Sequence, residues 1–109
     1  MPLRFFVPQC SDFFGPQFNY DSLNMGVLST NAHYGGFNVT GSKIIFSNGS
    51  FDPWHVLGIT KDISKDLPAV FIKGGVHCAD VFEQKGTDSA ELIQAREKIF
   101  QILRKWLKK

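Results

Sequence analysis

The sequence predicts an α/β fold with two parallel strands, a short crossover helix and a long C-terminal helix, preceded by a partly helical segment. Two short apolar runs, Lys43–Ser47 and Ala69–Lys73, are typical of strands buried on both faces. The residues between them are numerous enough for a crossover connection. From Asp88 onward, apolar residues recur at the spacing of one helical face.

The chain of 109 residues has the size of one domain or part of one. Its hydrophobic content of 43% and charged content of 20% exclude a disordered chain. The 11 phenylalanines are many for this length. Because so short a chain covers only about two-thirds of its unfolded surface, we expect some apolar surface to pack against polypeptide outside this sequence.

The N-terminal part of the chain, residues 1–42, carries the weaker signals. Residues 1–20 mix Phe, Pro, Gly and Asn and are expected to be irregular. Residues 21–34 favour a helix with Asp21 or Ser22 as its N-cap. The apolar face of this helix would consist of Leu23, Val27 and Leu28.

The C-terminal part, residues 43–109, carries the stronger signals. Pro53 suits the first position of a short helix, with Asp52 as its N-cap. Asp88 and Glu91 form a capping-box pattern at the start of the long helix. The apolar face of that helix would consist of Leu92, Ala95, Ile99, Ile102 or Leu103, and Trp106.

An acid and an imidazole follow the two expected strands. Asp52 lies a few residues past the first strand and His77 a few residues past the second. The carboxyl ends of parallel strands meet at one edge of the sheet, where ligands and catalytic groups gather. A carboxylate that orients a histidine is what the last two members of a hydrolytic triad require, and here the acid precedes the base in the chain. The sequence therefore predicts a paired acid and base at this edge.

The third member of such a triad is missing. None of the serines lies in the G-x-S-x-G pattern of a nucleophile elbow. Ser50 comes nearest to it, but Asp52 occupies the position where the pattern has its second glycine. The residues alone thus indicate an acid and a base without a nucleophile, or, more plainly, a helix cap and a polar loop histidine.

The stretches "FSNGSFDPWHVLGIT" and "GGVHCAD" resemble the C-terminal motifs of the serine peptidase family of prolyl carboxypeptidase, dipeptidyl peptidase II and thymus-specific serine protease. "CSDFFG" and the "YGG" at Tyr34–Gly36 are similar to landmarks upstream in those proteins. The resemblance covers nearly the whole chain, but only the C-terminal part of a typical member. Cys78 beside the base, and "HVLG" after the tryptophan, resemble the thymus-specific branch most.

The resemblance implies an α/β-hydrolase core, with residues 1–42 as the end of a helical insertion and a linker, and residues 43–109 as the C-terminal part of the core. It implies that Asp52 is the triad acid, that His77 is the triad base, and that Trp54 lines the pocket for the substrate residue before the scissile bond. The serine would belong to an N-terminal portion of the same polypeptide that this sequence does not include.

The implied function is that of a serine-type peptidase without metal or cofactor, which cleaves peptide substrates near a chain end, in some members after proline. The two features that resemble the thymus-specific branch weaken the expectation of strict cleavage after proline. The resemblance implies a lysosomal or secreted protein, although residues 1–8 do not form a signal peptide. The alternative is a non-catalytic binding or decoy module that retains the hydrolase scaffold.

Asn38 and Asn48 each begin a glycosylation sequon. Cys10 and Cys78 could form one disulfide. Cys78 could instead pair with a cysteine outside this chain, remain a buried inert thiol, or in principle act as a nucleophile.

Other classes of partner receive no support from the sequence. We expect no nucleic-acid binding, because no patch mixes basic and aromatic residues, and no membrane span, because no apolar run is long enough. The histidines and acids lack the usual spacing of zinc ligands. A homodimer is a further assembly that we consider.

Overall fold

The computed structural model describes residues 2–108. The chain forms two compact units, Met1–Thr40 and Gly41–Lys109. Among the described helices, none is both long and apolar enough to cross a membrane.

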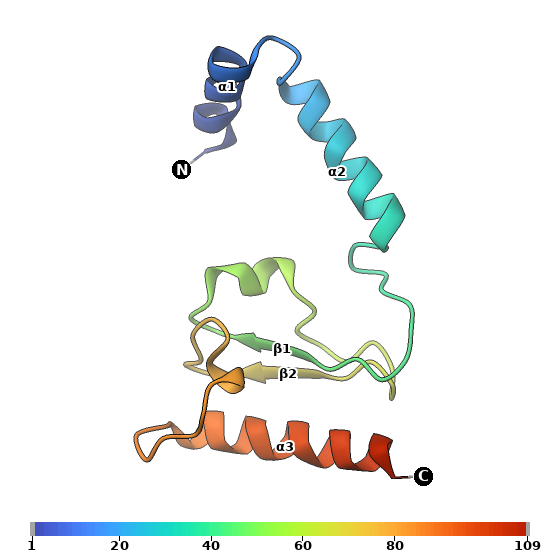
Figure 1. Ribbon diagram of the computed structural model, residues 1–109, viewed down its shortest axis with the longest axis vertical. Helices are drawn as coiled ribbons and strands as arrows, with labels where there is room; N and C mark the ends of the chain where they lie inside the picture. The colour runs from blue at the N-terminus through green and yellow to red at the C-terminus, as the bar shows by residue number, and fades with distance from the viewer. Residues whose placement is uncertain (1, 109) are drawn as a thin grey trace. The chain divides into compact units, whose positions relative to one another are not determined.

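The first unit contains α1 (Leu3–Phe14) and α2 (Tyr20–Tyr34) (Figure 1). The expectation that residues 1–20 are irregular is therefore wrong. Pro8 lies inside α1, where it cannot donate a backbone hydrogen bond. Burial of the neighbouring Val7 offsets part of that cost, and the helix ends only at Gly15, whose φ of 105° breaks it.

The N-cap of α2 is Asn19, and not Asp21 or Ser22 as expected. The side-chain oxygen of Asn19 accepts hydrogen bonds from the backbone N–H groups of Asp21 and Ser22 at 2.9 and 3.1 Å. The hydroxyl of Ser22 in turn accepts from the Asn19 N–H at 2.9 Å, which completes a capping box that was not predicted from the sequence. None of the three expected apolar residues of α2 is buried within the unit.

The second unit is built on two parallel strands, β1 (Phe46–Gly49) and β2 (Ala69–Ile72). Their register pairs Phe46 with Ala69 and Gly49 with Ile72. In Figure 1 both arrows point the same way, so the loops that follow the strands leave at the same end. The first strand begins later than expected, because Lys43 has a φ of 57° and cannot belong to an extended strand.

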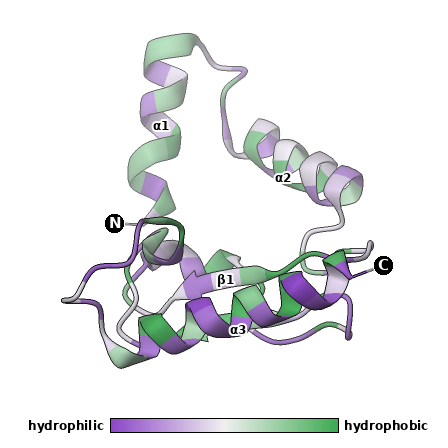
Figure 2. Cartoon of the chain, turned by 60° about the horizontal axis from the view of Figure 1, so that its bottom comes forward, coloured by the Kyte–Doolittle hydropathy of each residue, from purple (hydrophilic) through white to green (hydrophobic). Residues whose placement is uncertain are grey.

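The long helix α3 (Ala90–Leu107) packs against β2 on one side of the strands. Hydrophobic and hydrophilic residues alternate along it (Figure 2). The core of the unit consists of Val70, Ile72, Leu92 and Ala95, with Ile99 packed against it. Farther along the helix, Ile102 and Trp106 are half-buried and Leu103 is exposed, which settles the alternative that the sequence left open.

The N-cap of α3 is Ser89, whose hydroxyl accepts a hydrogen bond from the Leu92 N–H at 3.2 Å. The expected capping box of Asp88 and Glu91 is not formed, because the Asp88 carboxylate binds Arg96 and the Lys85 N–H instead. The N-terminus of the helix is thus capped one residue later than expected, and Asp88 is free for a tertiary contact.

The crossover contains η1 (Pro53–Leu57), a 3₁₀ helix on the side of the strands opposite α3 (Figure 1). Asp52 is its N-cap, as expected, and Pro53 occupies its first position. A second 3₁₀ turn, η2 (Ala79–Val81), follows β2. The predicted order of strand, short helix, strand and long helix is therefore confirmed.

The glycine inside α2 and the glycine that follows it should respond in opposite directions to the same substitution. Gly26 lies inside the helix with open space around its Cα, so Gly26→Ala should stabilise the chain by about 0.5–1 kcal/mol. Gly35 ends the helix with a φ of 88°, so Gly35→Ala should destabilise it by about 1–2 kcal/mol. Urea denaturation followed by circular dichroism measures both changes. Effects of equal sign would contradict this account of α2.

Candidate active site

The acid and the base that the sequence pointed to lie next to each other. Asp52 follows β1, His77 follows β2, and Nδ1 of His77 lies 2.8 Å from Oδ2 of Asp52. With its proton on Nδ1, the imidazole donates to the carboxylate. Its Nε2 then remains as the nitrogen that can accept a proton from another molecule or group.

Each carboxylate oxygen of Asp52 has its own partner. Oδ1 accepts a hydrogen bond from the Trp54 N–H at 3.0 Å, and Oδ2 accepts from His77. Asp52 is 7% exposed, whereas the side chain of His77 is 66% exposed. The buried carboxylate thus caps η1 and binds the imidazole at the same time, and the two hydrogen bonds fix its orientation.

The two loops that carry the acid and the base are hydrogen-bonded to each other. The Phe51 N–H donates to the Gly75 carbonyl at 2.9 Å, and the Gly74 N–H donates to the Ser50 hydroxyl at 2.8 Å. A Cβ at Gly49 would lie 2.3 Å from the Gly75 carbonyl oxygen, which is too close for any side chain. The close approach of the loops therefore requires glycine at position 49.

Asn48 links the two ends of the segment that carries Asp52. Its Nδ2 donates to the Ile59 carbonyl at 2.9 Å, across the whole of η1. The approach is tight, since a Cβ at Gly58 would lie 2.3 Å from Oδ1 of Asn48. Sequence reasoning missed this role and considered Asn48 only as a glycosylation site. A glycan on Nδ2 would compete with this hydrogen bond.

The side chain of His55 binds the main chain of Asp52. Its Nδ1 donates to the Asp52 carbonyl oxygen at 2.6 Å, and its ring centroid lies 5.4 Å from that of Phe71. His55 therefore braces the Asp52 main chain and does not compete with His77 for the carboxylate. The spacing of three residues between Asp52 and His55 was the one sequence feature that could have indicated this contact.

The hydrogen bond from His77 lowers the pKa of Asp52 below its ordinary value, and the Trp54 N–H acts in the same direction. Burial opposes both by raising the pKa, but is the smaller effect next to the His77 bond. The carboxylate is thus kept ionised and available to the imidazole. Within residues 2–108, no three His, Cys, Asp or Glu side chains gather as metal ligands would.

The remaining candidate residues are exposed. Trp54 is 64% exposed directly after the acid and offers a wide apolar surface there. Cys10 and Cys78 are both free and exposed, so Cys78 is not a buried thiol. A disulfide between these two cysteines, which belong to different units, or between Cys78 and a cysteine outside this chain, stays a prediction. Asn38, in the loop after α2, is also exposed.

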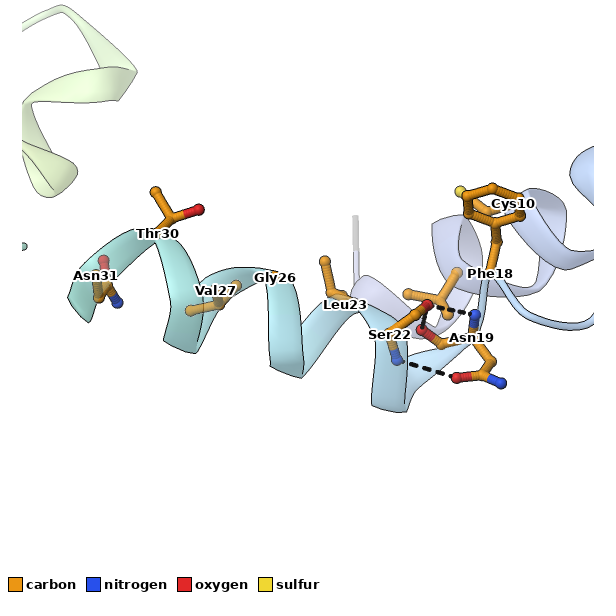
Figure 3. Close-up of a pocket in the computed structure, with 10 residues that line it drawn as sticks. Cys10, Phe18, Asn19, Ser22, Leu23, Gly26, Val27, Thr30 and Asn31 are labelled. Carbon is orange, nitrogen blue, oxygen red and sulfur yellow. Dashed lines mark hydrogen bonds between the residues drawn. The ribbon is translucent and has the colours of Figure 1, made fainter. Parts of the chain in front are cut away.

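The first unit holds an open groove of about 550 Å³ between its two helices (Figure 3). Its lining is mostly apolar and includes Val7, Phe18, Leu23 and Val27. The lining residues that the structure describes include no carboxylate and no imidazole. The groove explains why the apolar residues of α2 stay unburied: α1 covers only part of them.

The lowered pKa of Asp52 makes the stability of the chain depend on pH. The unfolded carboxylate takes up a proton near its ordinary value of 3.8, and the folded one at lower pH. The stabilisation is therefore complete above that value and is lost as the pH falls through the folded pKa. We expect Asp52→Asn to weaken the acid dependence of the free energy of unfolding, measured by urea denaturation at several pH values. The exposed Asp12→Asn is the control and should leave the dependence unchanged; an equal effect of both variants contradicts the assignment.

A family model described as serine carboxypeptidase S28 matches residues 1–99. Mouse thymus-specific serine protease is 38% identical over 106 residues, which cover 97% of this chain and 20% of the mouse protein. The human protein of that name is 39% identical over 87 residues, or 80% of this chain and 17% of its own length. Human lysosomal Pro-X carboxypeptidase is 37% identical over 76 residues, or 69% and 15%. The chain thus spans 20% or less of the length of these relatives, and it belongs to the serine carboxypeptidase S28 family.

Proposed function

We propose that this chain is the C-terminal part of a serine-type peptidase with an α/β-hydrolase core, in which Asp52 is the triad acid and His77 the triad base. The observation that carries the proposal is the 2.8 Å contact between the two side chains at the carboxyl ends of adjacent parallel strands. Membership of a peptidase family supports it. The nucleophilic serine would belong to preceding polypeptide of the same protein.

In this proposal the reaction is acyl transfer from a peptide to serine and then to water. Nε2 of His77 takes the serine proton as the hydroxyl attacks the peptide carbonyl, and returns it to the leaving amine. A water molecule then repeats the sequence with the acyl-enzyme. Asp52 stays ionised throughout, as its lowered pKa favours, holds the Nδ1 proton in place and stabilises the imidazolium that forms.

Trp54 is the residue that we propose for contact with the substrate. It follows the acid directly and exposes most of its ring, so it can form one wall of an apolar pocket near His77. One relative is named a Pro-X carboxypeptidase, which supports a peptide substrate cleaved near its end and, in that relative, beside proline. Cleavage strictly after proline is not part of our proposal, because Cys78 and the "HVLG" stretch differ from that branch.

We further propose a lysosomal or secreted location for the whole protein, which the name of the lysosomal relative supports. Such a location would expose the two sequons to glycosylation. The two candidates differ in their surroundings: Asn38 is exposed in a loop, whereas Asn48 lies in β1 with its Nδ2 bonded to Ile59.

The proposed triad is tested in a longer polypeptide that joins the preceding part of mouse thymus-specific serine protease to this chain. We expect a fluorophosphonate probe to label that polypeptide and not the 109-residue chain by itself. His77→Ala and Asp52→Asn should each lower kcat by about 10³–10⁴-fold, because both remove the oriented base. His33→Ala, an exposed histidine of α2, is the matched control and should retain activity.

Two outcomes would decide against the triad. Full activity in His77→Ala removes the proposed base, and labelling of the 109-residue chain that disappears in Ser50→Ala places a nucleophile inside it. If the longer polypeptide folds but neither reacts with the probe nor cleaves peptides, the alternative of a non-catalytic binding or decoy module is favoured. We retain that alternative because no serine of this sequence lies in a G-x-S-x-G pattern.

We expect a glycan on Asn38 and none on Asn48 when the chain is secreted from animal cells. Enzymatic removal of N-glycans converts a modified asparagine to aspartate, which mass spectrometry detects at each position. Thr40→Ala destroys the first sequon without changing Asn38 and should remove the signal. Conversion at Asn48 would show that its hydrogen bond to Ile59 does not protect it.

A further inference from the structure

Arg96 is a buried charge that the proposed chemistry does not use. It projects from α3, is only 6% exposed, and binds the segment that follows His77. The guanidinium donates to the carbonyl oxygens of Asp80 at 3.2 Å, Ala79 at 2.8 Å and Phe82 at 2.9 Å, and to the carboxylate of Asp88. Burial of a charge is costly unless the charge is paired and hydrogen-bonded, and here both conditions are met.

The Asp88 carboxylate is itself held in place. It accepts from the Lys85 N–H at 2.9 Å as well as from Arg96, and these two bonds lower its pKa below the ordinary value. The chain from Ala79 to Asp88 is therefore folded around a single guanidinium. Arg suits this position because its planar fork can donate to several fixed acceptors at once, which a Lys ammonium matches poorly.

The loop that carries His77 has little hydrophobic packing to hold it. The side chains of Val76, Val81 and Phe82 are all exposed, and Ala79 is the residue of the loop that packs against the core. The turn around His77 leads directly into the segment that Arg96 binds, since the Ala79 N–H donates to the Val76 carbonyl at 3.3 Å. The polar contacts of Arg96 are thus the main tie between this loop and α3.

We propose that Arg96 is a positioning residue, which holds the loop after β2 so that the ring of His77 stays within hydrogen-bond reach of Asp52. Its importance for catalysis rests on the proposed function, but its effect on the contact between His77 and Asp52 does not. Without Arg96, three carbonyl groups and a carboxylate would lose their shared donor. The exposed imidazole would then be free to leave the carboxylate.

The test uses the full 109-residue chain with ¹⁵N-labelled histidine and NMR detection of the ring nitrogens of His77. In the wild type we expect a proton on Nδ1 that is lost in Asp52→Asn. Arg96→Gln should abolish the same signal although both site residues are intact, and Arg96→Lys should restore part of it. Arg104→Gln, the same change at an exposed position of α3, is the matched control and should leave the signal as in the wild type.

Circular dichroism and contacts between α3 and β2 in the NMR spectra report whether each variant is folded. If Arg96→Gln does not fold, Asp88→Asn takes its place: it removes the charge partner but keeps the three carbonyl bonds, and should weaken the Nδ1 signal. A folded Arg96→Gln or Asp88→Asn chain with an unchanged signal overturns the inference. Loss of the signal in Arg104→Gln as well would also overturn it.

Failure of this inference and failure of the proposed function give different results. If Arg96 variants keep the Nδ1 proton while His77→Ala inactivates the longer polypeptide, the triad stands and the positioning role falls. If Arg96 variants lose the proton while His77→Ala leaves peptidase activity intact, the positioning role stands and the triad falls.

Discussion

The candidate site depends on the close approach of two glycines at the ends of two parallel strands. The register that pairs Gly49 with Ile72 brings β1 and β2 to an end at the same level, so their following loops leave side by side. Because Gly49 has no Cβ, the two backbones come close enough for the Phe51 N–H to reach the Gly75 carbonyl. With the backbones joined, a carboxylate three residues after Gly49 and an imidazole two residues after Gly75 can meet.

The two partners are held by different means, which suits the roles we propose. The acid is buried and braced by its own loop: Asn48 closes that loop, and His55 binds the Asp52 carbonyl. The base is exposed and its loop is held from outside, through Arg96 of α3. An orienting carboxylate has to stay still, whereas a general base has to present one nitrogen to other molecules. The exposure of His77 and the burial of Asp52 agree with that division.

The sequence predicted the parts of this site that depend on local patterns. Composition and spacing predicted a strand at residues 69–73, which is observed at 69–72, the proline at the start of η1, and the placement of Asp52 and His77 after two strands. The helix α1 was missed because residues 1–20 mix Phe, Pro, Gly and Asn, yet the helix contains Pro8 in its interior and buries only Val7. The strand start at Phe46 was missed because the sequence Lys–Ile–Ile–Phe does not reveal that Lys43 has a left-handed backbone conformation.

The contacts that hold the site together were beyond such patterns, because each joins residues whose proximity exists only after folding. Arg96 stands in a helix with cationic residues on its outer face, and nothing nearby distinguishes it as buried; its acceptors lie 8 to 17 residues away in a loop. Asn48 reaches across 11 residues to Ile59. Nearly all of these contacts lie within residues 48–96, so this segment supplies its own means of bringing acid and base together. In the proposed triad, the preceding polypeptide would have to place a serine hydroxyl next to Nε2 of His77. The exposed apolar side chains of Phe51 and Trp54, beside the acid, provide a surface on which that polypeptide or a substrate can pack.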